Sequence, residues 1–326
     1  MKNSPLLIVL GEPNSIFSEI LFKAYKKKII QKFNRPIVII GSENLLKLQM
    51  KFLKYSIKIQ KINILDLKNS NLNKKYINII NVDYKFNKAF VKISNNSNKY
   101  INNCFKIALK LLNEKSGFAL INGPVSKTHF LEKKYLGITE YLASKTKVNK
   151  KPTMLIYNSS FSVCPITTHL PINLITKNLT KNKIINDVMN IDLFYKKKFN
   201  KKPKFAILCL NPHCESISNV SEENKIIKPA LRYLINKKIK ARGPFSADTF
   251  FTKYNVTKYD VAIGMYHDQV LTPMKTIFGF NAINLTLGLP FLRVSPDHGT
   301  NNSMIGMNKS NPQSLISSIN FFKNIK

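Results

Sequence analysis

The sequence predicts an α/β protein with two domains and largely parallel sheets. Short apolar runs alternate with longer amphipathic segments along the 326 residues, which is the pattern of strands connected by crossover helices. This length is ordinary for two domains of that kind. A hydrophobic content of 44% is enough for packed cores and is too high for a disordered chain.

The expected strands are apolar runs bounded by polar residues, glycine or proline. They are residues 6–10, 37–40, 77–82, 118–121, 161–166, 205–210, 261–265 and 282–287. Helices are expected at 102–117, which Gly117 would end, and at 224–240, where Pro229 has to lie in the first turns. Residues 83–99 are rich in lysine and asparagine, and we interpret them as either a hairpin or an irregular excursion.

The formal net charge of +35 comes almost entirely from lysines spread along the chain, since only four of the 52 basic residues are arginine. A nucleic-acid-binding protein more often concentrates its basic residues and uses arginine to contact bases. We therefore interpret the charge as a compositional bias that still attracts phosphorylated metabolites, and we expect no nucleic-acid partner.

No apolar run approaches the roughly 20 residues that a membrane span requires. The first run, residues 6–10, fits a buried strand better than a signal peptide, so we expect no membrane association and a cytoplasmic protein. The four cysteines form no C-x-x-C pair, and we expect free thiols. Cys164 and Cys209 lie in apolar runs and are expected in the core, while Cys214, next to His213, is a conceivable ligand.

Histidines follow three of the predicted strands. His169 follows the run 161–166, His213 follows 205–210, and His267 follows 261–265. Parallel α/β sheets bind ligands at the carboxyl ends of their strands. Three imidazoles that converge there would bind zinc or another divalent transition metal, which acts as a Lewis acid on a hydroxyl or carbonyl. The alternative is three unrelated loop histidines, because the convergence is inferred from the fold and not from spacing.

Other polar residues are candidates for binding a phosphate or a carboxylate. They are Lys275, Arg293, Lys127 and the amide of Asn284. A single lysine in so basic a chain is more often solvated than functional, whereas arginine is rare here. Asp248 lies between apolar stretches and is suited to proton transfer.

The remaining two histidines are given lesser roles. His298, followed by Gly299, is expected to shape a loop or to lie beside a cofactor rather than to bind metal. His129, at the start of a predicted helix, is expected to be structural.

Taken together, these motifs resemble the 4-hydroxythreonine-4-phosphate dehydrogenases of vitamin B6 (pyridoxine) biosynthesis, nearly from end to end. The segments that carry the resemblance are "GPVSK", "GITEYL", "TTHLP", "LNPH", "GPFSADTFF", "YDVAIGMYHDQVLTPMK" and "NLTLGLPFLRVSPDHGT".

The resemblance implies a two-domain fold of the isocitrate/isopropylmalate dehydrogenase type. It also implies a homodimer with a divalent metal (zinc, magnesium, manganese or cobalt) and NAD or NADP in a cleft between the domains. We expect residues 1–128 and 270–326 to form the first, discontinuous domain, and residues 129–269 to form the second, with the dimer contacts. The chain has no G-x-G-x-x-G fingerprint, so the nicotinamide cofactor is expected from the resemblance alone.

The resemblance also assigns residues. It implies that His169, His213 and His267 bind the metal and that His267 reaches across the dimer interface. It places substrate contacts at Thr139, Lys275, Asn284 and Arg293, and we assign catalytic roles to Asp248 and Lys127. The implied reaction oxidises the C3 hydroxyl of 4-phosphooxy-L-threonine and then releases carbon dioxide, which leaves 3-amino-2-oxopropyl phosphate.

The sequence departs from the family pattern in four places. Ile138 replaces a substrate-binding histidine, residues 11–19 lack two glycines, residues 214–221 replace a glycine-rich stretch, and residues 301–306 differ near the expected cofactor. Missing glycines alter loop conformations.

These departures leave alternative functions open. The chain has either drifted and kept the activity, or it acts on another phosphorylated hydroxy acid, such as 4-phosphoerythronate or a threonate phosphate. A third alternative is a polyanion-binding protein on a decayed enzyme scaffold, which would gather its basic residues on one face.

Overall fold

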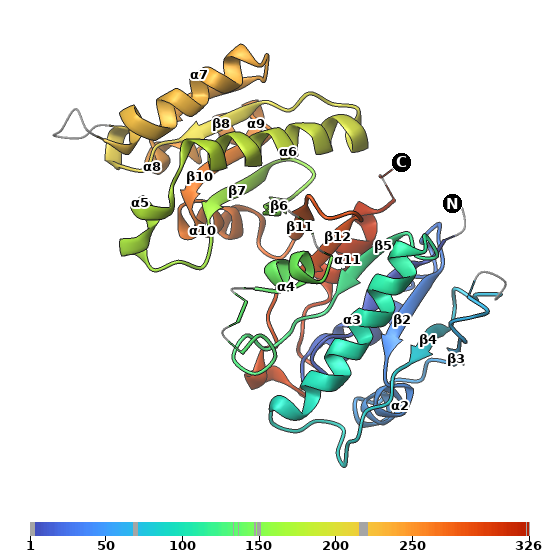
Figure 1. Ribbon diagram of the computed structural model, residues 1–326. Helices are drawn as coiled ribbons and strands as arrows, with labels where there is room; N and C mark the ends of the chain where they lie inside the picture. Colours follow the sequence, from blue (N-terminus) through green and yellow to red (C-terminus); the bar gives the residue numbers. More distant parts are fainter. Residues whose placement is uncertain are drawn as a thin grey trace. The chain divides into compact units, whose positions relative to one another are not determined.

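The computed structural model describes residues 4–67, 71–132, 134–135, 137–146, 148, 151–214, 221–323 and 325. The chain divides into two compact units (Figure 1). Unit 1 comprises Met1–Lys151 and Leu289–Lys323, and unit 2 comprises Pro152–Gly288 and Asn324–Lys326. Unit 1 is therefore built from two separate stretches of sequence.

The chain passes between the units later than the expected positions, which were after residues 128 and 269. The structure has the two crossings after residues 151 and 288. The first moves because Tyr141 and Leu142 are buried in the hydrophobic core of unit 1. The second moves because the segment after residue 269 packs onto the strands of unit 2.

Unit 1 contains a parallel sheet in the order β3-β4-β2-β1-β5-β12. The strands are β1 (Leu6–Val9), β2 (Ile37–Gly41), β3 (Ile59–Lys61), β4 (Ile77–Asn81), β5 (Ala119–Asn122) and β12 (Arg293–Pro296). The helices of this unit are α1 (Phe17–Lys26), α2 (Glu43–Phe52), α3 (Asn98–Asn113), α4 (Ile138–Lys145) and α11 (Gln313–Phe321).

Helix α3 shows how the sequence pattern becomes structure. Phe105, Ala108, Leu111 and Leu112 recur at helical spacing and are all buried. In Figure 1 the helix lies against the sheet of unit 1, where it contacts β1 and β2. This helix was expected at residues 102–117, and it begins four residues earlier and ends four residues earlier than predicted.

Unit 2 contains a mixed sheet in the order β11-β6-β7-β10-β8-β9. The pairs β11–β6 and β6–β7 are antiparallel, and the others are parallel. The strands are β6 (Thr153–Tyr157), β7 (Ser162–Thr167), β8 (Phe205–Leu208), β9 (Ala241–Phe245), β10 (Val261–Tyr266) and β11 (Ile283–Leu287). The helices are α5 (Ile175–Asn178), α6 (Lys181–Phe199), α7 (Lys228–Asn236), α8 (Ala247–Phe250), α9 (Lys253–Lys258) and α10 (His267–Phe278), and a π-helical turn at Glu223–Ile227 precedes α7.

The α/β class and the largely parallel sheets are confirmed, and every predicted strand is present. The prediction missed β3, β6, β9 and β12. Strand β3 is short and partly exposed, and β9 and β12 contain charged residues or proline, so none of these three has a continuous apolar signal. Residues 83–94 form neither helix nor strand, which agrees with an irregular excursion and not with a hairpin.

The predictions about cysteines and membrane spans can also be compared with the structure. All four cysteines are free, and Cys164 and Cys209 are buried as expected. Within the described part of the chain, none of the helices combines the length and the apolar character that crossing a bilayer requires.

Candidate functional site

The three strand-end histidines of unit 2 follow adjacent parallel strands, β7, β10 and β8. His169 comes two residues after β7, and His267 is the first residue of α10, directly after β10. His213 lies in the short turn after β8. Neighbouring strands lie about 4.8 Å apart, so one edge of the sheet carries all three histidine segments.

His169 and His267 lie side by side. Their ring centroids are 5.5 Å apart and their planes are inclined by 41°. Two imidazoles that share one zinc ion at about 2 Å from each nitrogen have centroids roughly 5 Å apart. The two rings of one chain are therefore about as far apart as two imidazoles on one ion.

A carboxylate orients one of these rings. Asp268 Oδ1 lies 2.7 Å from His267 Nδ1, a geometry in which Nδ1 carries the proton and donates it to the carboxylate. The free lone pair is then on Nε2. A carboxylate behind the histidine is the usual support of a metal-ligating imidazole.

His213 has a different neighbour. Its side chain is 72% exposed, and its Nδ1 lies 4.0 Å from Asp248 Oδ2. Among the residues that the structure describes, no group of three or more histidine, cysteine, aspartate or glutamate side chains is placed to hold a metal ion. The structure thus brings His169 and His267 together and leaves His213 beside Asp248. That all three bind one ion remains a prediction.

Asp248 is an ionised group at neutral pH. The Ser246 hydroxyl, and after it the Thr249 N–H and His213, hold the pKa of this exposed carboxyl below its usual value. A carboxylate in this state accepts a proton and does not supply one, which agrees with a role as a base.

Two of the histidines have an uncommon backbone conformation. His169 has φ 55° and His213 has φ 57°, both in the left-handed region. Residues other than glycine are infrequent there, and such conformations are concentrated at functional sites. Both residues are exposed to solvent.

In unit 1, the central feature is the buried guanidinium of Arg293, the first residue of β12, which is 1% exposed. Its Nε donates to Asn122 Oδ1 at 2.7 Å, and its Nη1 donates to Thr139 Oγ1 at 3.4 Å. Burial lowers the pKa of Arg293 to about 9, and Glu140 opposes that change. Arg293 therefore stays cationic at neutral pH and is held in a fixed orientation, as a phosphate or carboxylate binder has to be.

Asn122, a hydrogen-bond partner of Arg293, was not predicted from the sequence. Asn122 is the last residue of β5 and is 2% exposed. Its position at a strand end was visible in the sequence, but its pairing with Arg293 depends on β12 lying beside β5.

Ile138, which replaces the expected histidine, is the first residue of α4. Its side chain is partly buried and packs against the hydrophobic core of unit 1. The neighbouring Thr139 is close to Arg293. The apolar side chain is thus accommodated by packing, and it contributes no hydrogen bond to a ligand.

The other predicted site residues differ in their surroundings. Lys275 is exposed on α10, two turns or about 12 Å along the helix from His267. Asn284 Oδ1 in β11 is buried and has no hydrogen-bond partner among the described residues. Lys127 is exposed in a turn.

The two remaining histidines lie in unit 1. His298 Nδ1 is 3.1 Å from the carbonyl of Gly299, its Nε2 is buried, and burial lowers the pKa of this imidazole. His129 lies in a turn and not at the start of a helix, and its Nδ1 is 3.1 Å from Asn95 Oδ1. This contact agrees with a structural role for His129.

The segments that depart from the family pattern are only partly described. None of residues 12–19 has a positive φ, so this loop does not need the two missing glycines. In residues 301–306, Asn301 takes φ 50° and Gly306 takes φ 75°. Residues 215–220, in the replaced glycine-rich stretch, lie outside the described residues.

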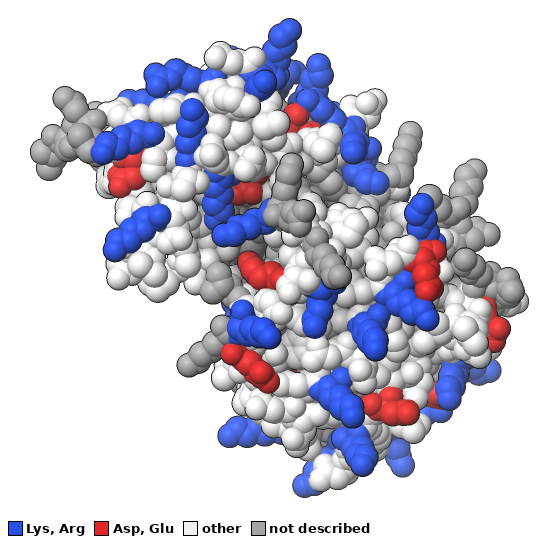
Figure 2. All heavy atoms as spheres, in the orientation of Figure 1, with Lys and Arg blue, Asp and Glu red and all other residues white. Residues whose placement is uncertain are grey.

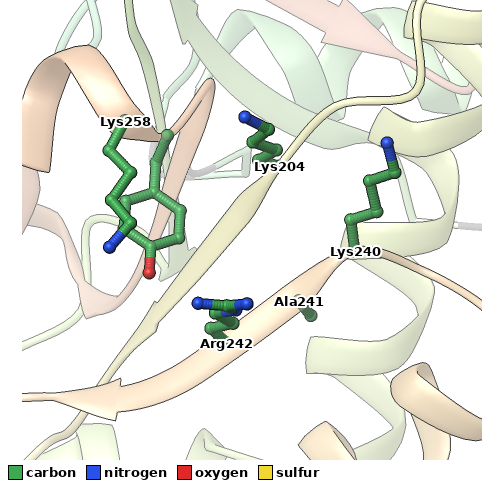
Figure 3. Close-up of a pocket in the computed structure, with 6 residues that line it drawn as sticks. Lys204, Lys240, Ala241, Arg242 and Lys258 are labelled. Atoms are coloured by element: carbon green, nitrogen blue, oxygen red, sulfur yellow. The ribbon is translucent and has the colours of Figure 1, made fainter.

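A pocket of about 340 Å³ lies elsewhere in unit 2, at the amino ends of β8 and β9 (Figure 3). Its lining residues are Lys204, Lys240, Ala241, Arg242, Lys258 and Tyr259. The histidines follow the carboxyl ends of the strands, so this basic pocket is separate from their site.

Basic side chains are not gathered into one patch on the face drawn in Figure 2. Lysine and arginine are scattered there among other residues, with acidic side chains between them. This distribution favours a compositional bias over a dedicated polyanion-binding face.

Comparisons with known proteins give consistent results. Residues 32–322 match the sequence profile of the family described as "Pyridoxal phosphate biosynthetic protein PdxA". A 4-hydroxythreonine-4-phosphate dehydrogenase from Sulfurihydrogenibium sp. (strain YO3AOP1) is 38% identical over 319 residues, which cover 96% of each chain. A protein of the same name from Bacteroides thetaiotaomicron is 28% identical over 97% of this chain and 88% of the relative.

Solved structures agree with the sequence relatives. The crystal structure of 4-hydroxythreonine-4-phosphate dehydrogenase from Klebsiella pneumoniae aligns with a TM-score of 0.83 and 25% identity, over 99% of this chain and 98% of that one. A beta-decarboxylating dehydrogenase from Thermococcus kodakarensis aligns with a TM-score of 0.51 and 12% identity, over 98% and 82% of the chains. The second likeness concerns the fold alone, and it agrees with the expected dehydrogenase-type architecture.

Proposed function

Since the chain belongs to the pyridoxal phosphate biosynthetic protein PdxA family, we propose that it is a 4-hydroxythreonine-4-phosphate dehydrogenase. The C3 carbon of 4-phosphooxy-L-threonine loses a hydride to NAD⁺ or NADP⁺, and the C3 hydroxyl loses a proton to a base. The resulting β-keto acid releases carbon dioxide and gives 3-amino-2-oxopropyl phosphate. The observation that carries this proposal is the 38% identity to a relative of that name over 96% of both chains.

The imidazole donors of unit 2 fit zinc or cobalt, whereas manganese and magnesium, which prefer oxygen ligands, are proposed from the family alone. His169 is proposed to share the ion with His267 of the partner subunit, and Asp268 supports the ring of His267. A bound ion supplies Lewis acidity, which favours loss of the hydroxyl proton and draws electron density from the carbonyl during decarboxylation. His213 is the third proposed ligand.

The chain's own residues carry out the remaining tasks. The ionised carboxylate of Asp248 accepts a proton from the substrate or from water. Arg293, held by Asn122 and Thr139, binds an anionic group of the substrate. Lys275 and the buried Oδ1 of Asn284 are the proposed additional substrate contacts. Lys127 is proposed to take part in catalysis.

The nicotinamide cofactor is proposed from the family, because the chain lacks the G-x-G-x-x-G fingerprint. When bound, it accepts the hydride. His298 and Gly299 remain the candidates to lie beside it, and the neutral imidazole of His298 has a buried Nε2 available to a polar group.

The first experiment measures NAD⁺ and NADP⁺ reduction with 4-phosphooxy-L-threonine, with and without zinc, cobalt, manganese or magnesium. Metal-dependent turnover that His213→Ala abolishes is the expected result. His129→Ala is the matched control, because His129 contacts Asn95 in unit 1 and is not a proposed ligand. A folded, metal-loaded wild-type protein without turnover contradicts the proposed substrate.

A second substrate class is favoured by the packing of Ile138. The hydrophobic core holds this side chain where the family has a hydrogen-bonding histidine, and loss of such a donor changes which substrate is accepted. The same assay with 4-phosphoerythronate and threonate phosphates tests this alternative. A higher kcat/KM for one of these acids than for 4-phosphooxy-L-threonine assigns the chain to the second class.

We further propose a homodimer in which His267 completes the site of the partner subunit. Exposed apolar side chains that such an interface in unit 2 would cover include Ile172, at 81% exposure, Ile277, at 43%, and Phe280, at 57%.

Mixing two inactive variants tests the shared site. His213→Ala and His267→Ala chains, unfolded and refolded together, form one intact site per mixed dimer only if each site takes residues from both chains. About a quarter of the wild-type activity should then return. No recovery in a confirmed mixed dimer places all three histidines of a site in one chain.

A further inference from the structure

The basic pocket at the amino ends of β8 and β9 is lined mainly by cationic residues. Four of its six lining residues are basic. They are Lys204, directly before β8, Lys240, directly before β9, Arg242 in β9 and Lys258 at the end of α9. Figure 3 shows their side chains around one open space. Four positive charges thus surround a volume of about 340 Å³.

The pairing of β8 with β9 places three of these residues on one face of the sheet. The two strands are parallel, and Ala206 lies opposite Arg242. Lys204 and Lys240 each precede one member of that pair by two residues. Residues two apart along a strand lie on the same face. Lys204, Lys240 and Arg242 are therefore brought together by the register of the strands.

Tyr259 gives the pocket a fixed apolar wall. It is 6% exposed, and its ring centroid lies 5.5 Å from that of Phe245 and 5.8 Å from that of Phe250. The backbone beside it is held as well, because the Lys204 carbonyl accepts from the Asp260 N–H at 2.9 Å. The pocket is therefore formed before any ligand binds, as ligand pockets usually are.

The four cations lack a carboxylate partner among the residues that the structure describes. The carboxylate of Asp260, next in sequence to the lining residues, is bonded by the Lys201 side chain and by the Lys204 N–H. Lys258 Nζ donates to the neutral hydroxyl of Tyr254 at 3.2 Å. Like charges held close together repel, and an anion in the pocket would remove that repulsion.

A chain with 52 basic residues also gathers lysines by chance. Unit 1 has a hollow of about 360 Å³ in which five of the eleven lining residues are lysine and none is arginine. The basic pocket of unit 2 has the higher basic fraction, and it contains Arg242, one of only four arginines. A guanidinium presents a planar fork that binds two oxygens of a phosphate in a fixed geometry. This difference favours a specific anion site in unit 2.

We propose that the basic pocket binds a small ligand with two linked phosphate groups, either free pyrophosphate or the diphosphate end of a nucleotide. The volume is in the range of small-ligand sites, and two phosphate groups carry roughly three to four negative charges. A nucleic acid would need an extended basic surface, whereas the basic residues on the face drawn in Figure 2 are scattered.

This inference goes beyond the proposed function and does not rest on it. Strand β10 begins two residues after Tyr259 and ends directly before His267. It is six residues or roughly 20 Å long, so the pocket is remote from the histidines. A ligand in the pocket does not contact the proposed metal ligands.

The test is calorimetric titration of the full-length chain with pyrophosphate, in a phosphate-free buffer at an ionic strength of about 0.15 M. Wild-type protein should bind pyrophosphate in the pocket, and Arg242→Ala should weaken that binding by about 10–100-fold. Arg242→Lys should restore only part of the affinity, because it keeps the charge and loses the fork. Arg232→Ala, at an exposed arginine of α7, is the matched control and should leave the affinity unchanged.

A second variant guards against misfolding of the first. Lys240→Ala should weaken binding by about tenfold, with Lys26→Ala in the hollow of unit 1 as its control. The proposed cofactor also carries a diphosphate, so turnover is measured for the same variants. Arg242→Ala and Lys240→Ala should leave kcat and the KM for NAD⁺, NADP⁺ and substrate unchanged, because the pocket is remote from the histidines.

Three other anions define the ligand. Orthophosphate and citrate should each bind at least about tenfold more weakly than pyrophosphate, because the first has one phosphate group and the second has only carboxylates. ADP identifies the source of the diphosphate. ADP binding that is tighter than pyrophosphate binding and is lost in Arg242→Ala assigns a nucleotide, and weaker or equal binding assigns free pyrophosphate.

The remaining outcomes overturn the inference. They are a folded wild-type chain that binds no pyrophosphate, and binding that Arg242→Ala and Lys240→Ala leave intact, which places the anion at another site. Equal weakening by Arg232→Ala shows attraction to net charge alone. Citrate or orthophosphate bound as tightly as pyrophosphate overturns the diphosphate assignment.

None of these outcomes affects the proposed function. Conversely, wild-type protein that binds pyrophosphate in this pocket and does not oxidise 4-phosphooxy-L-threonine overturns the function and supports the inference.

Discussion

The two units present their proposed functional residues in opposite ways. Unit 2 places His169 and His213 on turns with positive φ, exposed to solvent. Unit 1 places Arg293 inside a regular strand at 1% exposure, with its donors directed at Asn122 and Thr139. A metal ligand has to be accessible to an exchanging ion, whereas a cation that orients an anion works best when its direction is fixed beforehand.

The two units are also expected to differ in how their functional residues affect the free energy of unfolding. Non-glycine residues with left-handed backbone occur in both units, and in unit 2 they include the exposed His169 and His213. Unit 1 carries the cost of a buried charge, which its partners offset. Substitutions in the two units should therefore affect folding and ligand binding in different proportions.

The largest effect on folding is expected for Arg293→Met. The substitution removes the donor to Asn122 Oδ1 and leaves the Glu140 carboxylate, whose Oε2 is buried without a described partner, uncompensated. A loss of about 3–5 kcal/mol in the free energy of unfolding is expected. Urea unfolding followed by circular dichroism measures it, because the chain has no tryptophan.

The control for this substitution is Arg232→Met, at an exposed position on α7. It should change the free energy of unfolding by less than about 0.5 kcal/mol. Equal stability of the Arg293→Met and Arg232→Met chains would contradict the contrast between a fixed, buried unit 1 site and an open unit 2 site.

His169→Asn should have little effect on stability and a large effect on metal binding, the opposite of Arg293→Met. Asparagine tolerates positive φ as well as histidine does, so the free energy of unfolding should stay within about 0.5 kcal/mol of wild type. Loss of a ligand should weaken binding of Co²⁺ or Zn²⁺ by about a thousandfold, or roughly 4 kcal/mol. Competition titration against a chelator of known affinity measures this, and unchanged affinity would remove His169 from the proposed ligands.

Asp187 tests whether unit 2 also holds a costly buried charge. This residue of α6 accepts from Thr153 Oγ1 at 2.5 Å, and burial raises its pKa to about 6 from a usual value near 3.8. The native state therefore binds more protons than the unfolded state between about pH 4 and pH 6, so stability falls as pH rises through that window.

Asp187→Asn removes this dependence. The variant should match wild type near pH 4 and exceed its free energy of unfolding by about 2–3 kcal/mol at pH 7. Denaturant unfolding at both pH values measures the difference, with the exposed Asp83→Asn as control. A stability difference that does not vary between pH 4 and pH 7 would show that burial does not oppose ionisation of Asp187.

The smallest effect is expected for Ile138→His. Its side chain is only partly buried against the core of unit 1, so about 1 kcal/mol of stability should be lost. If the natural substrate is 4-phosphooxy-L-threonine, the added donor should raise its kcat/KM by no more than about tenfold. A larger gain, with loss of activity on another phosphorylated hydroxy acid, would indicate that Ile138 selects that other substrate.

The central strands and the position of the histidines could be predicted because their signal is local. Runs such as Leu6–Val9 and Val261–Tyr266 are apolar, short and bounded by polar residues. Their burial can therefore be predicted from the consecutive residues of the run alone. Strand β12 escaped prediction because it begins with Arg293, and a buried arginine is recognisable only when Asn122 and Thr139 are in place around it.

The sequence by itself determined the α/β class and the strands that form the centres of the sheets. It also placed His169, His213 and His267 at strand ends. These features could be predicted because strand periodicity and strand-end polarity are properties of neighbouring residues. Only the tertiary structure decided that His169 lies beside His267, that His213 lies beside Asp248, and that Gln269 joins the end of β8 to α10. Those pairings depend on the strand order β7-β10-β8, which brings together residues up to about a hundred positions apart and which no local pattern encodes.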